Sequence, residues 1–149
     1  MKKIKEIRLG SYSAFFCEKH EEDELTISRD EIYYTYEMSG LGPSIDEGPI
    51  EKEIKWKYCK SYSNEYQKLF DELVKEFEKY KKPDMDKILD GGGFGITIFY
   101  NEGKEKRLFY HYCKQLYEDK PLLYIFSIMQ NMIPKGEARP ALLRKKFKI

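Results

Sequence analysis

The stretch IEKEIKWKYC, residues 50–59, constrains the fold more than any other part of the chain. Its apolar residues Ile54, Trp56 and Tyr58 alternate with charged ones, which is the period of two of a β-strand. One face of this strand is therefore packed and the other faces water. That division is typical of an antiparallel sheet that is covered on one side.

An amphipathic helix is predicted directly after this strand. Its apolar residues recur at spacings of three and four: Tyr66, Leu69, Phe70, Leu73, Val74, Phe77 and Tyr80. Ser63 has the side chain of an N-cap, and Pro83 marks the end because the residue before a proline avoids the helical region. The pattern predicts a helix of about five turns with one buried face.

A second helix is predicted after Asp119, with Pro121 tolerated in its first turn. It runs through LLYIFSIMQNMI and ends at Pro134. This segment is apolar nearly throughout, so we expect it to be buried more completely than the first helix.

Shorter alternating stretches predict further strands at 4–9, 12–19, 25–28, 32–38, 94–100 and 106–112. Gly10 and Ser11 are interpreted as a turn or bulge, the acidic stretch HEEDE (20–24) as a polar break, and NEGK (101–104) as a hairpin turn in which Gly103 takes positive φ. The prediction is an α+β fold, an antiparallel sheet of six to seven strands with two helices packed on one face. We expect a single domain over 1–149, with a basic C-terminal segment at 134–149.

The composition narrows the compartment and the partners. The net charge of the 149 residues is +1, so the molecule as a whole lacks the excess positive charge that favours binding to nucleic acid or an anionic membrane. No apolar run is long enough for a signal-peptide core or a membrane helix. Cys17, Cys59 and Cys113 are far apart and odd in number, which is typical of free thiols in a reducing cytoplasm.

Positive charge is concentrated at the end of the sequence. Residues 134–149 hold six basic residues against one acid. The candidates for binding nucleic acid or another anionic partner are Arg139, Arg144, Lys145, Lys146 and Lys148. The alternative is that this segment docks on the acidic body of its own chain, and residues 141–149 fit a strand, a helix or a disordered tail.

Three motifs suggest chemistry and are better explained by structure. DGGGFG (90–95) resembles a phosphate loop, but it precedes a strand rather than a helix and no Lys–Ser/Thr pair follows it, so a flexible connector is favoured. In HYC (111–113), His111 and Cys113 are too far apart along a strand for a nucleophile and its base. HEEDE fits no calcium loop. We therefore expect no catalytic residue, no metal site and no cofactor.

Tyrosine is the most unusual component, with 13 residues, many on predicted strands. Exposed tyrosines are enriched at protein interfaces, and Tyr33, Tyr36, Tyr110 and Tyr112 are the candidate contacts. The functional prediction is a non-catalytic protein-binding module of the inhibitor or immunity type, whose partner is another protein and not a membrane. The alternatives are a nucleic-acid accessory protein using the basic segment, and a small enzyme using His111, Cys113 or His20.

The stretches IKWKY, GITIFYNEGK and IMQNMIPKGE resemble small proteins of low-GC Gram-positive bacteria that have no assigned activity. The resemblance extends over most of the chain and rests on packing and turn residues. It implies the α+β fold and implies nothing about mechanism.

Overall fold

The computed structural model describes residues 3–12, 20–39, 50–59, 63–83, 93–111 and 118–144. Six antiparallel strands form one sheet in the order β4-β3-β2-β1-β5-β6. The strands are β1 (Ile4–Tyr12), β2 (His20–Ser28), β3 (Glu31–Ser39), β4 (Ile50–Cys59), β5 (Gly93–Tyr100) and β6 (Glu105–His111). The predicted α+β fold is confirmed.

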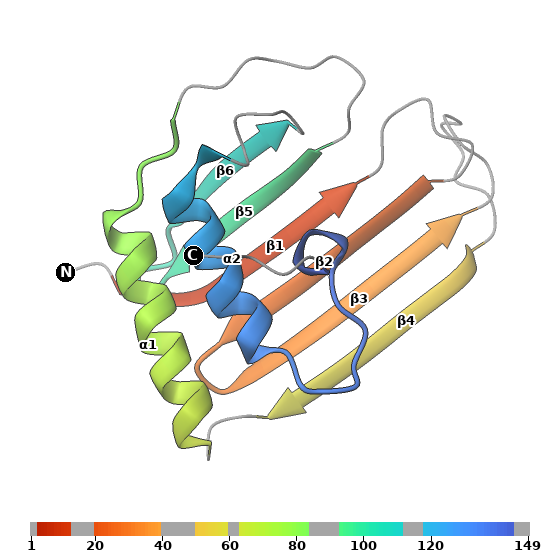
Figure 1. Ribbon diagram of the computed structural model, residues 1–149, viewed down its shortest axis with the longest axis horizontal. Coiled ribbons are helices and arrows are strands. Elements are labelled where there is room, and N and C mark those ends of the chain that lie inside the picture. Colours follow the sequence, from red (N-terminus) through yellow and green to blue (C-terminus); the bar gives the residue numbers. More distant parts are fainter. Residues whose placement is uncertain are drawn as a thin grey trace.

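Two helices lie side by side on one face of the sheet and run in opposite directions (Figure 1). Helix α1 (Asn64–Lys79) begins at the predicted cap, where Ser63 Oγ accepts the amide of Tyr66. Helix α2 (Lys120–Met132) is capped by Asp119, whose carboxylate accepts the amide of Leu122. Both predicted helices are confirmed.

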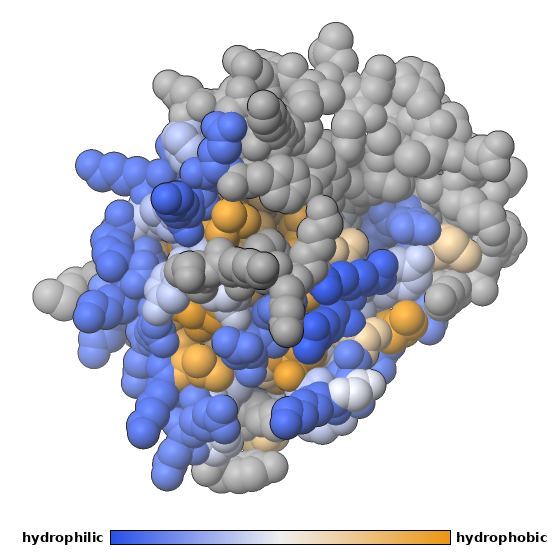
Figure 2. Space-filling model, viewed as in Figure 1, coloured by the Kyte–Doolittle hydropathy of each residue, from blue (hydrophilic) through white to orange (hydrophobic). Residues whose placement is uncertain are grey.

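The hydrophobic core fills the layer between the helices and the sheet. Pairing places one row of side chains across all six strands on the helix side: Trp56, Tyr34, Leu25, Leu9, Ile96 and Leu108. Helix α1 adds Phe70 and Leu73, and α2 adds Leu122 and Met129, all fully or almost fully buried. In Figure 2, hydrophilic residues line the outer side of α1 and hydrophobic ones show between the helices.

The β5–β6 hairpin forms as the sequence predicts. Gly103 takes φ of 82°, and its amide donates to the carbonyl of Tyr100. Only glycine adopts this conformation without strain, which explains its place in the turn.

Two predicted interruptions of the N-terminal strands are wrong. Gly10 and Ser11 do not form a turn, because β1 passes through them in continuous register with β2 and β5. The stretch 20–24 is no polar break, because it lies inside β2 and its Asp23 is buried. Hydrogen bonds to Asp23 satisfy its carboxylate, so that a charged residue fits where propensity alone favours a turn.

Candidate functional site

The face of the sheet opposite the helices is covered by no helix among the described residues (Figure 1). We call it the open face. One row of residues crosses it from β4 to β6: Lys55, Thr35, Glu24, Gly10, Gly95 and Phe109. The next row is Lys57, Tyr33, Thr26, Arg8, Thr97 and Arg107.

The open face contains a hollow of about 560 Å³. Its floor includes Gly10 and Gly95, which lie directly opposite each other on neighbouring strands. Around them are acidic, basic, hydroxyl and aromatic side chains: Arg8, Glu22, Glu24, Thr35, Glu37, Thr97, Phe99, Glu105, Arg107 and Phe109. A volume of this size falls in the range of ordinary ligand pockets.

The backbone does not require glycine at either floor position. The described residues with positive φ are Gly103 and Gly136, so neither Gly10 nor Gly95 needs the left-handed region. A Cβ atom at Gly10 would lie 3.6 Å from the Asp23 carbonyl oxygen, and one at Gly95 would lie 3.6 Å from the Phe109 ring. Both are ordinary contacts, so alanine would fit, and glycine keeps the floor low.

Aromatic rings form one side of the hollow. Phe109 is 60% exposed, which is unusual for a large apolar side chain and more than any other described phenylalanine. The Arg8 guanidinium lies 4.5 Å from the centre of the Phe99 ring, a cation–π arrangement. The hollow therefore offers a partner an apolar wall beside charged groups.

The charges around the hollow are predominantly negative. Arg8 Nε lies 2.9 Å from a carboxylate oxygen of Glu6, and Arg107 lies 3.1 Å from Glu105. Glu22, Glu24 and Glu37 also line the hollow. They lie on β2 and β3, and the glycine pair separates these strands from β6. The lining holds Glu22, Glu24, Glu37 and Glu105 against Arg8 and Arg107, so acidic side chains outnumber basic ones and the local potential is negative.

One buried hydroxyl on the open face is not satisfied. Among the described residues, Thr26 Oγ1 is the buried side-chain oxygen without a hydrogen-bond partner. Thr26 lies between Arg8 and Tyr33 in the row next to the glycine pair. Buried polar groups are normally paired with protein groups or with ordered water.

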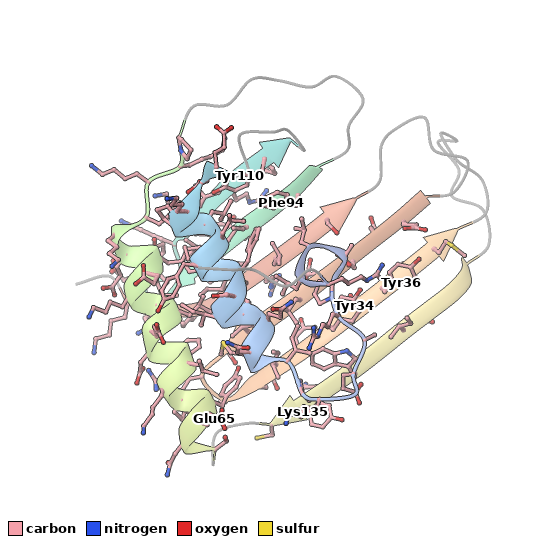
Figure 3. The ribbon with its side chains drawn as sticks, viewed as in Figure 1. Tyr34, Tyr36, Glu65, Phe94, Tyr110 and Lys135 are labelled. Atoms are coloured by element: carbon pink, nitrogen blue, oxygen red, sulfur yellow. The ribbon has the colours of Figure 1, made fainter. Side chains whose placement is uncertain are left out.

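The predicted tyrosine contacts are divided between the two faces. Tyr33 lies on the open face, partly exposed, with Lys57 Nζ 5.8 Å from its ring centre. Tyr36 lies on the other face, on β3 to the side of the segment that follows α2 (Figure 3), and burial together with Glu21 raises its pKa. Tyr112 lies outside the described residues.

Tyr110 belongs to the core and not to an accessible surface. It is 1% exposed, stacks on Phe94 with ring centres 4.6 Å apart, and lies beside it near the start of α2 (Figure 3). Its hydroxyl donates to the Tyr80 hydroxyl at 2.8 Å, and burial raises its pKa to about 12. The alternation along β6 turns Tyr110 inward and Phe109 outward.

The basic segment packs on the helix side of the sheet. Its described part includes a short 3₁₀ helix, η2 (Ala141–Leu143), with Leu143 fully buried. Trp56 Nε1 donates to the Ala138 carbonyl at 2.9 Å, and the Ala141 amide donates to Asp23 at 3.0 Å. Residues 138–143 therefore pack on the body of their own chain, as the self-docking alternative expects, and we call them the docked segment.

The basic side chains themselves are not gathered into one site. Arg139, in the docked segment, and Arg144, directly after it, are exposed, away from the open face. Lys145, Lys146 and Lys148 lie outside the described residues. The binding of nucleic acid by this segment stays a prediction.

The chemical motifs add no site within the described part of the chain. There, no three His, Cys, Asp or Glu side chains are placed to hold a metal ion. Gly93 and Gly95 of DGGGFG lie in β5, and residues 90–92 lie outside the description, as do Tyr112 and Cys113 of HYC. Within the same residues, no helix is long and apolar enough to cross a membrane.

No protein-family model, curated protein or solved structure matches the chain. The function must therefore be argued from the open face itself. The sequence pointed to tyrosines and did not single out the glycine pair. The available signal is a glycine in each of two alternating strands, but from the sequence alone Gly10 is interpreted as a turn or bulge and Gly95 as part of a connector, because the sequence does not reveal that β1 pairs with β5.

Proposed function

We propose that the protein is a non-catalytic binding module that holds another protein on its open face. The observation that carries this proposal is the hollow with a glycine floor and an exposed Phe109 at its side. A sheet face with no binding role gains nothing from glycines where alanine fits, and it usually shields a phenylalanine from water.

The chemistry of the hollow favours binding over a reaction. Its lining offers carboxylates, guanidinium groups, hydroxyls and aromatic rings on a rigid scaffold of paired strands. Aromatic and arginine side chains beside a recess are the groups that contribute most to protein interfaces. A module of the inhibitor or immunity type acts by covering a surface of its partner, and this face suits that role.

The test compares proteins retained from a native lysate by four immobilised full-length chains. They are the wild type, Phe109→Ser, Gly95→Val and the control Lys75→Ala on the exposed side of α1. We expect one protein to be retained by the wild type and the control, and lost by both open-face variants. Circular dichroism and thermal unfolding verify that each variant is folded.

The purified partner then gives a dissociation constant for each variant. Loss of a phenylalanine from the centre of an interface commonly costs about tenfold or more in affinity. A partner that binds all four chains equally contradicts the proposal, and so does repeated failure to retain any protein.

A further inference from the structure

We propose that the hollow receives a lysine or arginine side chain of the partner protein. This inference rests on the proposed function and identifies the chemistry of the contact. Three features of the hollow support it: its floor, its two walls and its charge.

The floor lets a foreign side chain approach the backbone closely. Gly10 and Gly95 are paired across β1 and β5, so two adjacent positions in the middle of the sheet lack side chains. Glycine inside a strand costs about 0.5–1 kcal/mol relative to alanine, and nothing in the backbone conformation repays that cost. A strand glycine of this kind often marks a place where a ligand lies against the chain.

The walls suit a side chain with an apolar stem and a cationic end. Glu24 is paired with Gly10, and Phe109 is paired with Gly95, so that a carboxylate and an aromatic ring flank the floor in one row. Three strand spacings separate β2 from β6 along this row, about 14 Å, which is enough for an extended lysine or arginine. The stem lies on the glycines beside Phe109, and the cation faces Glu24.

The charge selects a cation over an anion. Glu22 pairs directly with Glu37, and Glu37 with Glu53, across β2, β3 and β4, and Lys55 Nζ lies 2.5 Å from a carboxylate oxygen of Glu53. Like charges directly opposite each other, such as Glu22 and Glu37, destabilise a sheet, so this acidic lining accepts a partner's cation more readily than an anion. The arginines of the hollow are already engaged by Glu6 and Glu105, which leaves less positive charge for an anionic ligand.

The test titrates the isotope-labelled full-length chain with short glycine–serine peptides and follows backbone amide signals by NMR. The peptides carry arginine, lysine, norleucine or glutamate at the centre. We expect the arginine and lysine peptides to shift the signals of Gly10, Glu24 and Gly95, and the other two peptides to leave them unchanged. The shifts should diminish as salt is added, because exposed charge pairs are screened.

Two variants and one control connect the shifts to the hollow. Glu24→Gln should weaken binding of the arginine peptide about threefold to fivefold, the upper range for one exposed ion pair. Gly95→Ala should also weaken it, because the added methyl group raises the floor under the stem. Glu65→Gln, in the first turn of α1, should not change it. Shifts caused by the glutamate peptide, or none with any peptide, overturn the inference.

The captured partner separates this inference from the proposed function. A partner whose affinity falls in Phe109→Ser and Glu24→Gln supports both. If Phe109→Ser weakens binding and Glu24→Gln does not, the open face binds protein without a cation in the hollow. If neither variant weakens binding, both proposals are wrong.

Discussion

Asp23 joins three parts of the chain through one carboxylate. It accepts hydrogen bonds from Ser11 Oγ at 2.5 Å, Tyr34 OH at 2.9 Å and the Ala141 amide at 3.0 Å. The donors belong to β1, β3 and the docked segment. Asp23 itself is almost fully buried, so removing the carboxylate leaves these donors without an acceptor and without water.

We therefore expect Asp23→Ala to lower the free energy of unfolding by about 3 kcal/mol. Urea denaturation measures this change. The control is the exposed neighbour Glu22→Ala, for which about 0.5 kcal/mol or less is expected. Equal effects of the two substitutions would contradict the role given to Asp23.

Substitutions of Gly10 and Gly95 should stabilise the protein, in contrast to the substitution of Asp23. Gly10→Ala and Gly95→Ala should each raise the free energy of unfolding by about 0.5 kcal/mol, because alanine restricts the unfolded chain and meets no clash. Gly103→Ala, at φ of 82°, should lower it by about 1 kcal/mol. If the two floor variants destabilise the protein, the glycines serve the fold and not a ligand.

At the scale of elements, the two helices are tied together where α1 ends and α2 begins. Tyr80 follows α1, and its hydroxyl donates to Asp119 Oδ2 at 2.8 Å. Asp119 Oδ1 accepts the amide of Leu122 and so caps α2. One carboxylate thus fixes both the start of α2 and its position against α1.

Asp119→Ala should lower the free energy of unfolding by about 2 kcal/mol, because the helix cap at Leu122 and the hydrogen bond from Tyr80 are lost together. Ser63→Ala removes only a cap, at α1, and should cost about 1 kcal/mol. Thermal and chemical unfolding measure both. Tyr80→Phe in a Tyr110→Phe background isolates the bond between Tyr80 and Asp119, because the Tyr80 hydroxyl also accepts from Tyr110. In that background, a cost equal to that of Asp119→Ala would show that the cap contributes nothing.

The sequence predicted elements whose signals are local. Helix α1 follows from the spacing of Tyr66, Phe70 and Phe77, and the hairpin turn follows from Gly103, because both depend on near neighbours. The pairing of Gly10 with Gly95 joins residues far apart in the chain, so the hollow could not be predicted from either strand alone. Tyr110, a predicted contact, lies in the core because alternation gives two faces and does not say which one the helices cover.

At the scale of the whole molecule, the core is rich in tyrosines that stay protonated when folded. Burial raises the pKa of Tyr34, Tyr66, Tyr80 and Tyr110 above the value of 10.0 expected for an unfolded chain, and that of Tyr110 is about 12. Above pH 10 the unfolded chain releases these protons while the folded chain keeps them. The stabilisation is therefore complete below pH 10 and is lost as the pH rises through the folded-state values.

We expect alkaline unfolding above pH 10 in which tyrosinate absorbance and loss of circular dichroism change together. Tyr110→Phe removes one of these groups and should flatten the decline of stability with pH. Tyr110→Phe also removes the hydrogen bond to Tyr80. The cost of that loss is measured separately as the change in unfolding free energy at pH 7, where no tyrosine ionises. Full ionisation of the tyrosines at pH 11 with an unchanged dichroism spectrum would contradict the prediction.

The bond from Trp56 to Ala138 gives the molecule a built-in optical reporter. Trp56 is the single tryptophan, and it is nearly buried, with Tyr34 and Tyr58 rings centred 5.8 and 6.0 Å away. Its indole nitrogen is held by the docked segment, so detachment of that segment hydrates the ring and shifts its fluorescence to longer wavelength. Emission from one native residue thus follows the docking of residues 138–143 on the sheet without any added label.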